Sequence, residues 1–225
     1  MKNLQKNQFL ELTTIENIIE NHQFIDTKGF ELFGRLAKVS DNIEKNILRK
    51  VFKASSSIGE LTKKDGKKIF YRMAGGRYYK VITDFPANLS SEKYLIFDKK
   101  IAKCLSGFLS SNLLWWYNQV YTCYPNWKLY EIESFPIPLD KLSENKIQEI
   151  ENLYSHYLVD IESNANVRQT ENYANIDSFK EYKIGKSKHL IDKMDDIICP
   201  LYGLTKDEIK FIKNYEIGFR LQEEQ

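Results

Sequence analysis

The segment from residue 70 to residue 85, FYRMAGGRYYKVITDF, constrains the fold of this 225-residue chain more than any other stretch. Aromatic and β-branched residues, which favour strands, fill positions 69–73 and 78–83, and Gly75 and Gly76 lie between them. Two such runs on either side of a glycine pair are typical of a β-hairpin. Cations and tyrosines share this predicted ribbon. They are Arg72, Arg77, Lys80, Tyr71, Tyr78 and Tyr79.

Capping-box sequences mark the starts of three predicted helices. In this motif a polar side chain caps an exposed amide, and a glutamate three positions later reaches back to another. The motif begins at Thr13, Asp41 and Thr205. We therefore predict short helices at about 13–22 and 41–53, and a last helix after Thr205.

Helical spacing continues in the second half of the chain. Apolar residues recur every three or four positions in the segments 101–121, 144–162 and 186–199, each of which we predict to be a helix. The polar stretch 163–175 predicts a flexible link, and the short apolar run 94–97 predicts a third strand.

These patterns predict an α+β fold. A small twisted antiparallel or mixed sheet within residues 67–97 would pack on the 101–121 helix, and a C-terminal helical region would follow. The predicted organisation is an α+β domain over 1–139, with its first helices within 1–55, and a helical region over 140–225.

Composition limits the class of protein. With 42% hydrophobic residues the chain can bury a core, and its start lacks the apolar run of a signal peptide. Its most apolar stretch, 105–121, is too short and too polar to span a bilayer. Three cysteines without a CxxC pair indicate reduced thiols, so we expect a cytoplasmic protein and no membrane partner.

Charge is distributed unevenly along the chain. Residues 44–103 hold 15 Lys/Arg against 6 Asp/Glu, whereas residues 126–225 hold 13 against 19, within a formal net charge of +2. A basic block beside an acidic one indicates a face that binds a polyanion. A solvated lysine-rich surface is the alternative. The basic run 63–68 predicts a polar turn that leads into the hairpin.

No pattern for catalysis is evident. Glycine-rich phosphate loops are absent, and the three histidines lack metal-ligand spacing. Glu181 and Lys183 match the short E-x-K element of nucleases, but no Pro-Asp precedes them on a predicted strand. We therefore expect no catalytic residues, no metal ligands and no cofactor in this chain.

The candidate DNA contacts follow from side-chain chemistry. Four lysines would neutralise phosphates, Arg72 and Arg77 would contact guanine or phosphate, and Asn112 and Asn126 would contact adenine unless they have structural roles. The full predicted set is Lys63, Lys64, Lys67, Lys68, Arg72, Arg77, Tyr78, Lys80, Asn112, Asn126 and Lys128. The aromatic run 113–117 is more typical of a core than of a base-stacking platform.

Four segments in order, 70–82, 110–117, 131–138 and 191–209, carry a family likeness. They resemble the C-terminal target-recognition region of TaqI-like type IIG restriction-modification enzymes. The loop 122–128 departs from that family because it lacks the usual basic cluster.

The resemblance implies that the chain recognises a specific sequence in double-stranded DNA. It implies that S-adenosylmethionine and Mg²⁺ belong to methyltransferase and nuclease domains outside this chain, which would dock on the acidic 140–225 region. The chain would then be a subunit or a truncated, inactive remnant of such an enzyme. The alternative from another class is a helical protein-interaction scaffold.

Overall fold

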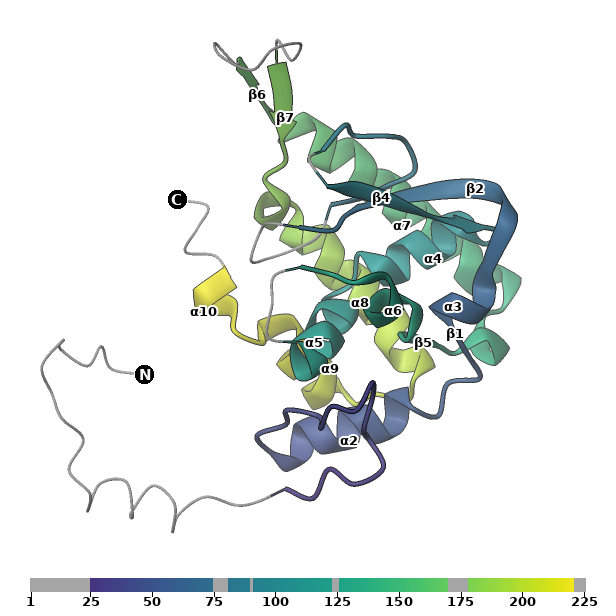
Figure 1. Cartoon of the computed structure of the whole chain (residues 1–225), viewed down its shortest axis with the longest axis vertical. Helices are drawn as coiled ribbons and strands as arrows, with labels where there is room; N and C mark the ends of the chain where they lie inside the picture. The colour runs from purple at the N-terminus through teal and green to yellow at the C-terminus, as the bar shows by residue number, and fades with distance from the viewer. Residues whose placement is uncertain (1–24, 75–80, 90, 123–125, 170–177, 221–225) are drawn as a thin grey trace, which may run out of the picture.

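A computed structural model describes residues 25–74, 81–89, 91–122, 126–169 and 178–220. The helices are α2 (Asn42–Val51), α3 (Ile58–Leu61), α4 (Ala102–Leu109), α5 (Asn112–Tyr121), α6 (Leu129–Glu133), α7 (Glu144–Ser163), α8 (Lys188–Leu201), α9 (Lys206–Asn214) and α10 (Ile217–Arg220), with 3₁₀ turns η1 (Leu139–Lys141) and η2 (Ile184–Ser187). The strands are β1 (Ser56–Ser57), β2 (Thr62–Arg72), β3 (Ile82–Thr83), β4 (Glu92–Phe97), β5 (Pro136–Ile137), β6 (Asn166–Gln169) and β7 (Ser178–Glu181). The predicted α+β class is confirmed (Figure 1).

The largest sheet contains the predicted hairpin and the predicted third strand. Its order is β3-β2-β4, and both pairings are antiparallel. In the hairpin, Phe70 lies opposite Thr83 and Tyr71 lies opposite Ile82. The predicted turn at Gly75 and Gly76 lies outside the described residues, as does the predicted helix at 13–22.

Strand β2 is longer than predicted. The basic run 63–68 is not a turn, because β2 begins at Thr62 and pairs with β4. A bulge interrupts this pairing, so that Thr62 and Lys67 both lie opposite Phe97. The bulge contains Gly66, whose φ is +153°, and a Cβ atom there would lie 2.1 Å from the carbonyl oxygen of Phe97. Only glycine fits this bend without displacing β4.

The helix predicted over 101–121 is two helices. Ser110 ends α4, and the side chain of Ser111 accepts a hydrogen bond from the amide of Leu114 at the start of α5. Serine caps helices because its hydroxyl satisfies an amide that has no partner within the helix. The chain therefore turns between Ser110 and Ser111 instead of continuing straight.

The sheet packs on a helical layer formed by α4 and α7. Ile69 and Phe97 on the inner face of the sheet are fully buried, and the hydroxyl of Tyr154 on α7 donates to the carbonyl of Ile82 at 3.2 Å. Gly107 lets α4 approach α7 closely, since a Cβ atom there would lie 2.5 Å from the side chain of Ile150.

The C-terminal helices belong to the same core. One cluster of buried apolar residues runs from Ala37 to Ile212, so the described parts of 1–139 and of 140–225 share a single core. The predicted link 163–175 contains strand β6, which pairs with β7 in a ribbon that projects at the top of Figure 1. Among the described residues, no helix is long and apolar enough to cross a membrane.

The capping box predicted at Thr205 is confirmed, and of the one predicted at Asp41 only the cap by Asp41 itself is present. The Asp41 carboxylate accepts from the amide of Glu44, and Thr205 and Glu208 form a complete capping box. The Glu44 carboxylate instead accepts from the amide of Ser40 and from the indole N–H of Trp116 on α5. This buried carboxylate joins α2 to the helical layer.

The first prediction concerns the bulge. We expect Gly66→Ala to lower the free energy of unfolding by about 3–5 kcal/mol, because it combines an unfavourable φ with a clash against the backbone of β4. Gly203→Ala is the matched control, since Gly203 has a φ of +75° and open space around it. It should cost only about 1–2 kcal/mol. Urea denaturation measures both, and equal losses would show that the contact with Phe97 is unimportant.

Candidate nucleic-acid interface

Strand β2 carries different side chains on its two faces. Side chains alternate along a strand, so Ile69 and Tyr71 point into the core while Lys68, Phe70 and Arg72 point outward. On β4, Tyr94 lies opposite Phe70 and is 49% exposed. We call Lys68, Phe70, Arg72 and Tyr94 the outer sheet face.

Three members of the outer sheet face, Lys68, Phe70 and Tyr94, are in contact. The rings of Phe70 and Tyr94 lie with their centroids 5.9 Å apart at an interplanar angle of 60°. The Lys68 ammonium stands 4.4 Å from the centroid of the Tyr94 ring. Cations and aromatic rings therefore share this ribbon, as the sequence of the segment predicts.

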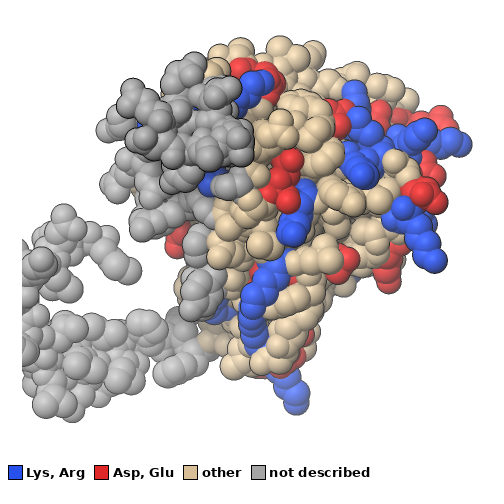
Figure 2. Space-filling model, turned by 45° about the horizontal axis from the view of Figure 1, so that its top comes forward, with Lys and Arg blue, Asp and Glu red and all other residues tan. Residues whose placement is uncertain are grey.

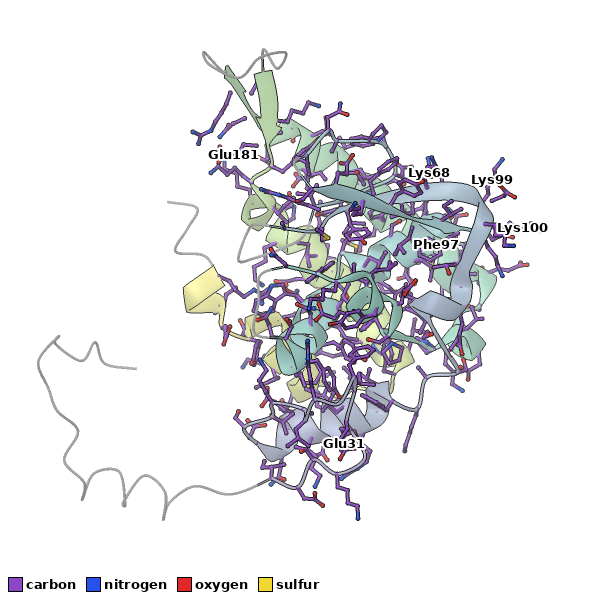
Figure 3. The ribbon with its side chains drawn as sticks, in the orientation of Figure 1. Glu31, Lys68, Phe97, Lys99, Lys100 and Glu181 are labelled. Atoms are coloured by element: carbon purple, nitrogen blue, oxygen red, sulfur yellow. The ribbon has the colours of Figure 1, made fainter. Side chains whose placement is uncertain are left out.

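A second group of cations lies where β2 bends. Because β2 pairs with the end of β4, the basic run of β2 lies beside the turn that follows Phe97. Figure 3 labels Lys68, Lys99 and Lys100 at this corner, and Figure 2 shows blue side chains gathered there with red ones among them. We call this group the basic corner. It consists of Lys63, Lys64, Lys67, Lys68, Lys99 and Lys100.

The cations of the basic corner are not equally available. The Lys67 ammonium pairs with the Asp84 carboxylate at 3.3 Å, whereas the side chains of Lys63 and Lys64 are exposed. Exposed cations attract a polyanion over about 8–10 Å at physiological salt. Lys63 and Lys64 are therefore better placed for phosphate contacts than Lys67.

The end of β2 lies beside the loop that precedes α6. The amide of Trp127 donates to the carbonyl of Met73 at 2.8 Å, and the Trp127 side chain is buried. Its neighbours Asn126 and Lys128 are exposed. The structure thus places Asn126 and Lys128 beside the end of β2, where Arg72 is half-buried. Arg77, Tyr78 and Lys80 lie outside the described residues.

The prediction that Asn112 contacts DNA is wrong. Asn112 is fully buried at the start of α5. Its side-chain amide donates to the carboxylate of Asp195 at 2.6 Å, and its carbonyl oxygen accepts from the guanidinium of Arg220 at 2.5 Å. The side-chain amide and the side-chain carbonyl of Asn112 are thus both hydrogen-bonded inside the protein, and neither can contact a base.

Asp195, on α8, caps helix α5 from within the core. Its two carboxylate oxygens accept from the amides of Asn112 and Leu113, at 3.1 and 3.2 Å. These amides have no partner within their own helix, and a negative charge is favourable at a helix N-terminus. Burial nevertheless raises the pKa of Asp195 to about 6.

The E-x-K residues lie at the end of strand β7. The Glu181 carboxylate forms ion pairs with Arg168 at 2.7 Å and with Lys183 at 3.4 Å. The hydrogen bond from Arg168 is the main reason that its pKa is lowered. Across the described part of the chain, no group of His, Cys, Asp and Glu side chains is arranged to hold a metal ion.

Sequence reasoning missed Tyr94, Lys99 and Lys100. The pattern of residues 94–97 predicts a strand but not which face Tyr94 occupies, and its place opposite Phe70 puts it on the outer face. Lys99 and Lys100 follow directly after β4, which pairs with the basic strand β2. This lysine pair at the end of a predicted strand was the feature of the sequence that could have identified them.

Comparisons with protein-family models, curated proteins and solved structures found no match to this chain. The site is therefore interpreted from its own geometry and chemistry.

The second prediction concerns the pH dependence that Asp195 confers. Its pKa is higher in the folded chain than the ordinary value of 3.8, so its contribution to stability is greatest below pH 3.8 and decreases as the pH rises to about 6. Asp195→Asn cannot titrate. We expect the difference in unfolding free energy between the native chain and this variant to shrink by about 2–3 kcal/mol from pH 4 to pH 7.

Urea denaturation at a series of pH values measures this difference. Asp196→Asn is the control, because Asp196 lies on the same helix with an exposed side chain paired to Lys213. A difference for Asp195→Asn that stays constant across the series would contradict the prediction.

Proposed function

We propose that this chain is a double-stranded DNA recognition module of a restriction-modification system. It would act in the cytoplasm and position a methyltransferase or endonuclease that lies outside these residues. The observation that carries the proposal is the basic corner, which adjoins an outer sheet face of cations and aromatic rings. This combination suits the phosphates and bases of nucleic acid better than any other common polyanion.

Affinity would come from the basic corner. Each lysine that neutralises a phosphate releases condensed counterions, so binding weakens steeply as salt increases. In the part of the chain that the structure describes, Lys63, Lys64, Lys99 and Lys100 form no ion pair that would compete with phosphate. Lys67 would have to leave Asp84 and contributes less.

Specificity is assigned to the hairpin and to the adjoining loop. Arg77 follows Gly75 and Gly76 in the sequence, and a two-stranded ribbon is narrow enough to enter the major groove. Asn126 and Lys128 lie beside the end of β2 and would contact the same stretch of duplex. Arginine forms two parallel hydrogen bonds with guanine, and asparagine does so with adenine.

The acidic C-terminal helices would face away from DNA and dock the catalytic partner. An open hollow between α7 and α8 is lined in part by Leu153, His156 and Ile197. Val159, also on α7, is 71% exposed. S-adenosylmethionine and Mg²⁺ would belong to that partner. No step of the chemistry is assigned to this chain.

The third prediction tests the basic corner by charge reversal. Lys→Glu at Lys63, Lys64, Lys67 and Lys68 should reduce affinity for random duplex at low salt and lower the slope of log K against log salt by about 3–4. Fluorescence anisotropy measures both quantities. The matched control reverses four exposed lysines of the C-terminal region, namely Lys186, Lys193, Lys206 and Lys210.

The control carries the same change in net charge at a different place. It should retain most of the affinity if the basic corner binds DNA. Equal losses in the two variants would indicate a general charge effect, and binding that is absent or independent of salt would refute the proposed function. A protein-interaction scaffold would keep its partner when the basic corner is reversed.

The fourth prediction concerns base recognition. Arg77→Lys keeps the charge but removes the planar fork that matches guanine. It should leave affinity for non-specific duplex nearly unchanged and reduce discrimination by about 1–3 kcal/mol at one base pair of the recognised site. Competition binding with single-base variants measures this. Uniform weakening on every duplex would make Arg77 a phosphate contact.

A further inference from the structure

The outer sheet face has an apolar centre that the described residues leave open. Tyr94 is 49% exposed although it lies in the middle of β4, and the half-buried ring of Phe70 is next to it. Aromatic side chains carry a large apolar area and gain stability when that area is covered. This pair is instead available to a ligand with a flat apolar surface.

Among the described residues, the Lys68 ammonium lies over the Tyr94 ring, 4.4 Å from its centroid, and the Phe70 ring lies beside it. At an exposed site such a contact changes an equilibrium constant by a factor of about 2–5. Stacking of a nucleobase on an aromatic side chain is worth a factor of about 5–150. A base would therefore displace Lys68, and the released ammonium would be free to pair with a phosphate.

The surrounding charge identifies the ligand as nucleic acid. Lys68 and Arg72 flank the two rings along β2, and the basic corner continues from Lys68 to Lys99 and Lys100. An uncharged aromatic ligand would gain nothing from these cations. A base attached to a phosphate backbone gains from both the rings and the cations.

We propose that Phe70 and Tyr94 form a stacking shelf for an unpaired base of the bound DNA. This inference rests on the proposed function. A base within an intact duplex is stacked on its neighbours and cannot reach a sheet face, so the shelf takes a base that is mismatched, looped out or single-stranded. Unstacking is least costly at such positions. The module therefore prefers duplex that contains unpaired bases over fully paired duplex.

The experiment compares two DNA probes of the same length and flanking sequence, one fully paired and one with a short central bubble of unpaired thymines. Anisotropy titrations at fixed salt give the ratio of the two affinities. We expect the native chain to bind the bubble at least 5-fold more tightly. Tyr94→Ala should reduce this ratio to about 1, because it removes the ring on which the unpaired base stacks, and Tyr94→Phe should retain the preference.

Phe33→Ala is the matched control. Phe33 is 46% exposed, close to the value for Tyr94, and its segment lies at the opposite end of the molecule, where Figure 3 labels Glu31. It should leave the ratio unchanged. Suppose that paired duplex still binds in a salt-dependent way. A ratio of 1 for the native chain, or a preference for the bubble that survives Tyr94→Ala, then overturns the stacking shelf but not the proposed function. Failure to bind either probe overturns the proposed function as well.

Discussion

The carboxylate of Asp195 joins the two halves of the chain, and much of the helical layer depends on it. It reaches from α8 to the first amides of α5, 82 and 83 residues earlier in the sequence. Asn112 connects this carboxylate to Arg220, whose guanidinium lies 4.4 Å from the ring of Trp115. A buried acid is costly unless its oxygens accept hydrogen bonds, and here the start of a helix supplies the donors. The break between α4 and α5 is therefore tied to the position of α8.

The helical layer in turn supports the sheet and leaves one of its faces open. Ile69, Phe97 and Ile82 are buried against this layer. The inner face therefore supplies the stability of the sheet, whereas Lys68, Phe70 and Tyr94 on the outer face make few contacts with the core. Side chains that contribute little to folding are free to serve binding. This division explains how a chain with a large apolar core also presents rings and cations together on its surface.

The parts of the fold that were predictable from the sequence depend on local signals. The hairpin, the third strand and the helix starts at Asp41 and Thr205 each follow from residues within a few positions of one another. The break at Ser110 was missed because serine also occurs inside helices, where its hydroxyl bonds to the preceding turn. The strand over residues 63–68 was missed because lysine disfavours strands and only pairing with β4 overrides that preference.

The site was predictable to the same limited extent. A run of lysines identifies a basic surface, but it does not reveal that a bulge places both Thr62 and Lys67 opposite Phe97, at the end of β4. Asn112 has the right chemistry for reading adenine, and its burial depends on Asp195, which is distant in sequence. Residues 126–128 could be associated with the end of the hairpin only through the backbone contact between Trp127 and Met73.

That backbone contact has a consequence for variation between related chains. A hydrogen bond from the amide of Trp127 to the carbonyl of Met73 does not depend on which side chains stand at the neighbouring positions. The buried indole of Trp127 anchors the loop, while Asn126 and Lys128 remain on the surface. Substitutions at these two positions would therefore alter what the surface contacts without moving the loop. A scaffold of this kind permits new binding preferences to arise by single changes, with little loss of stability to be compensated elsewhere.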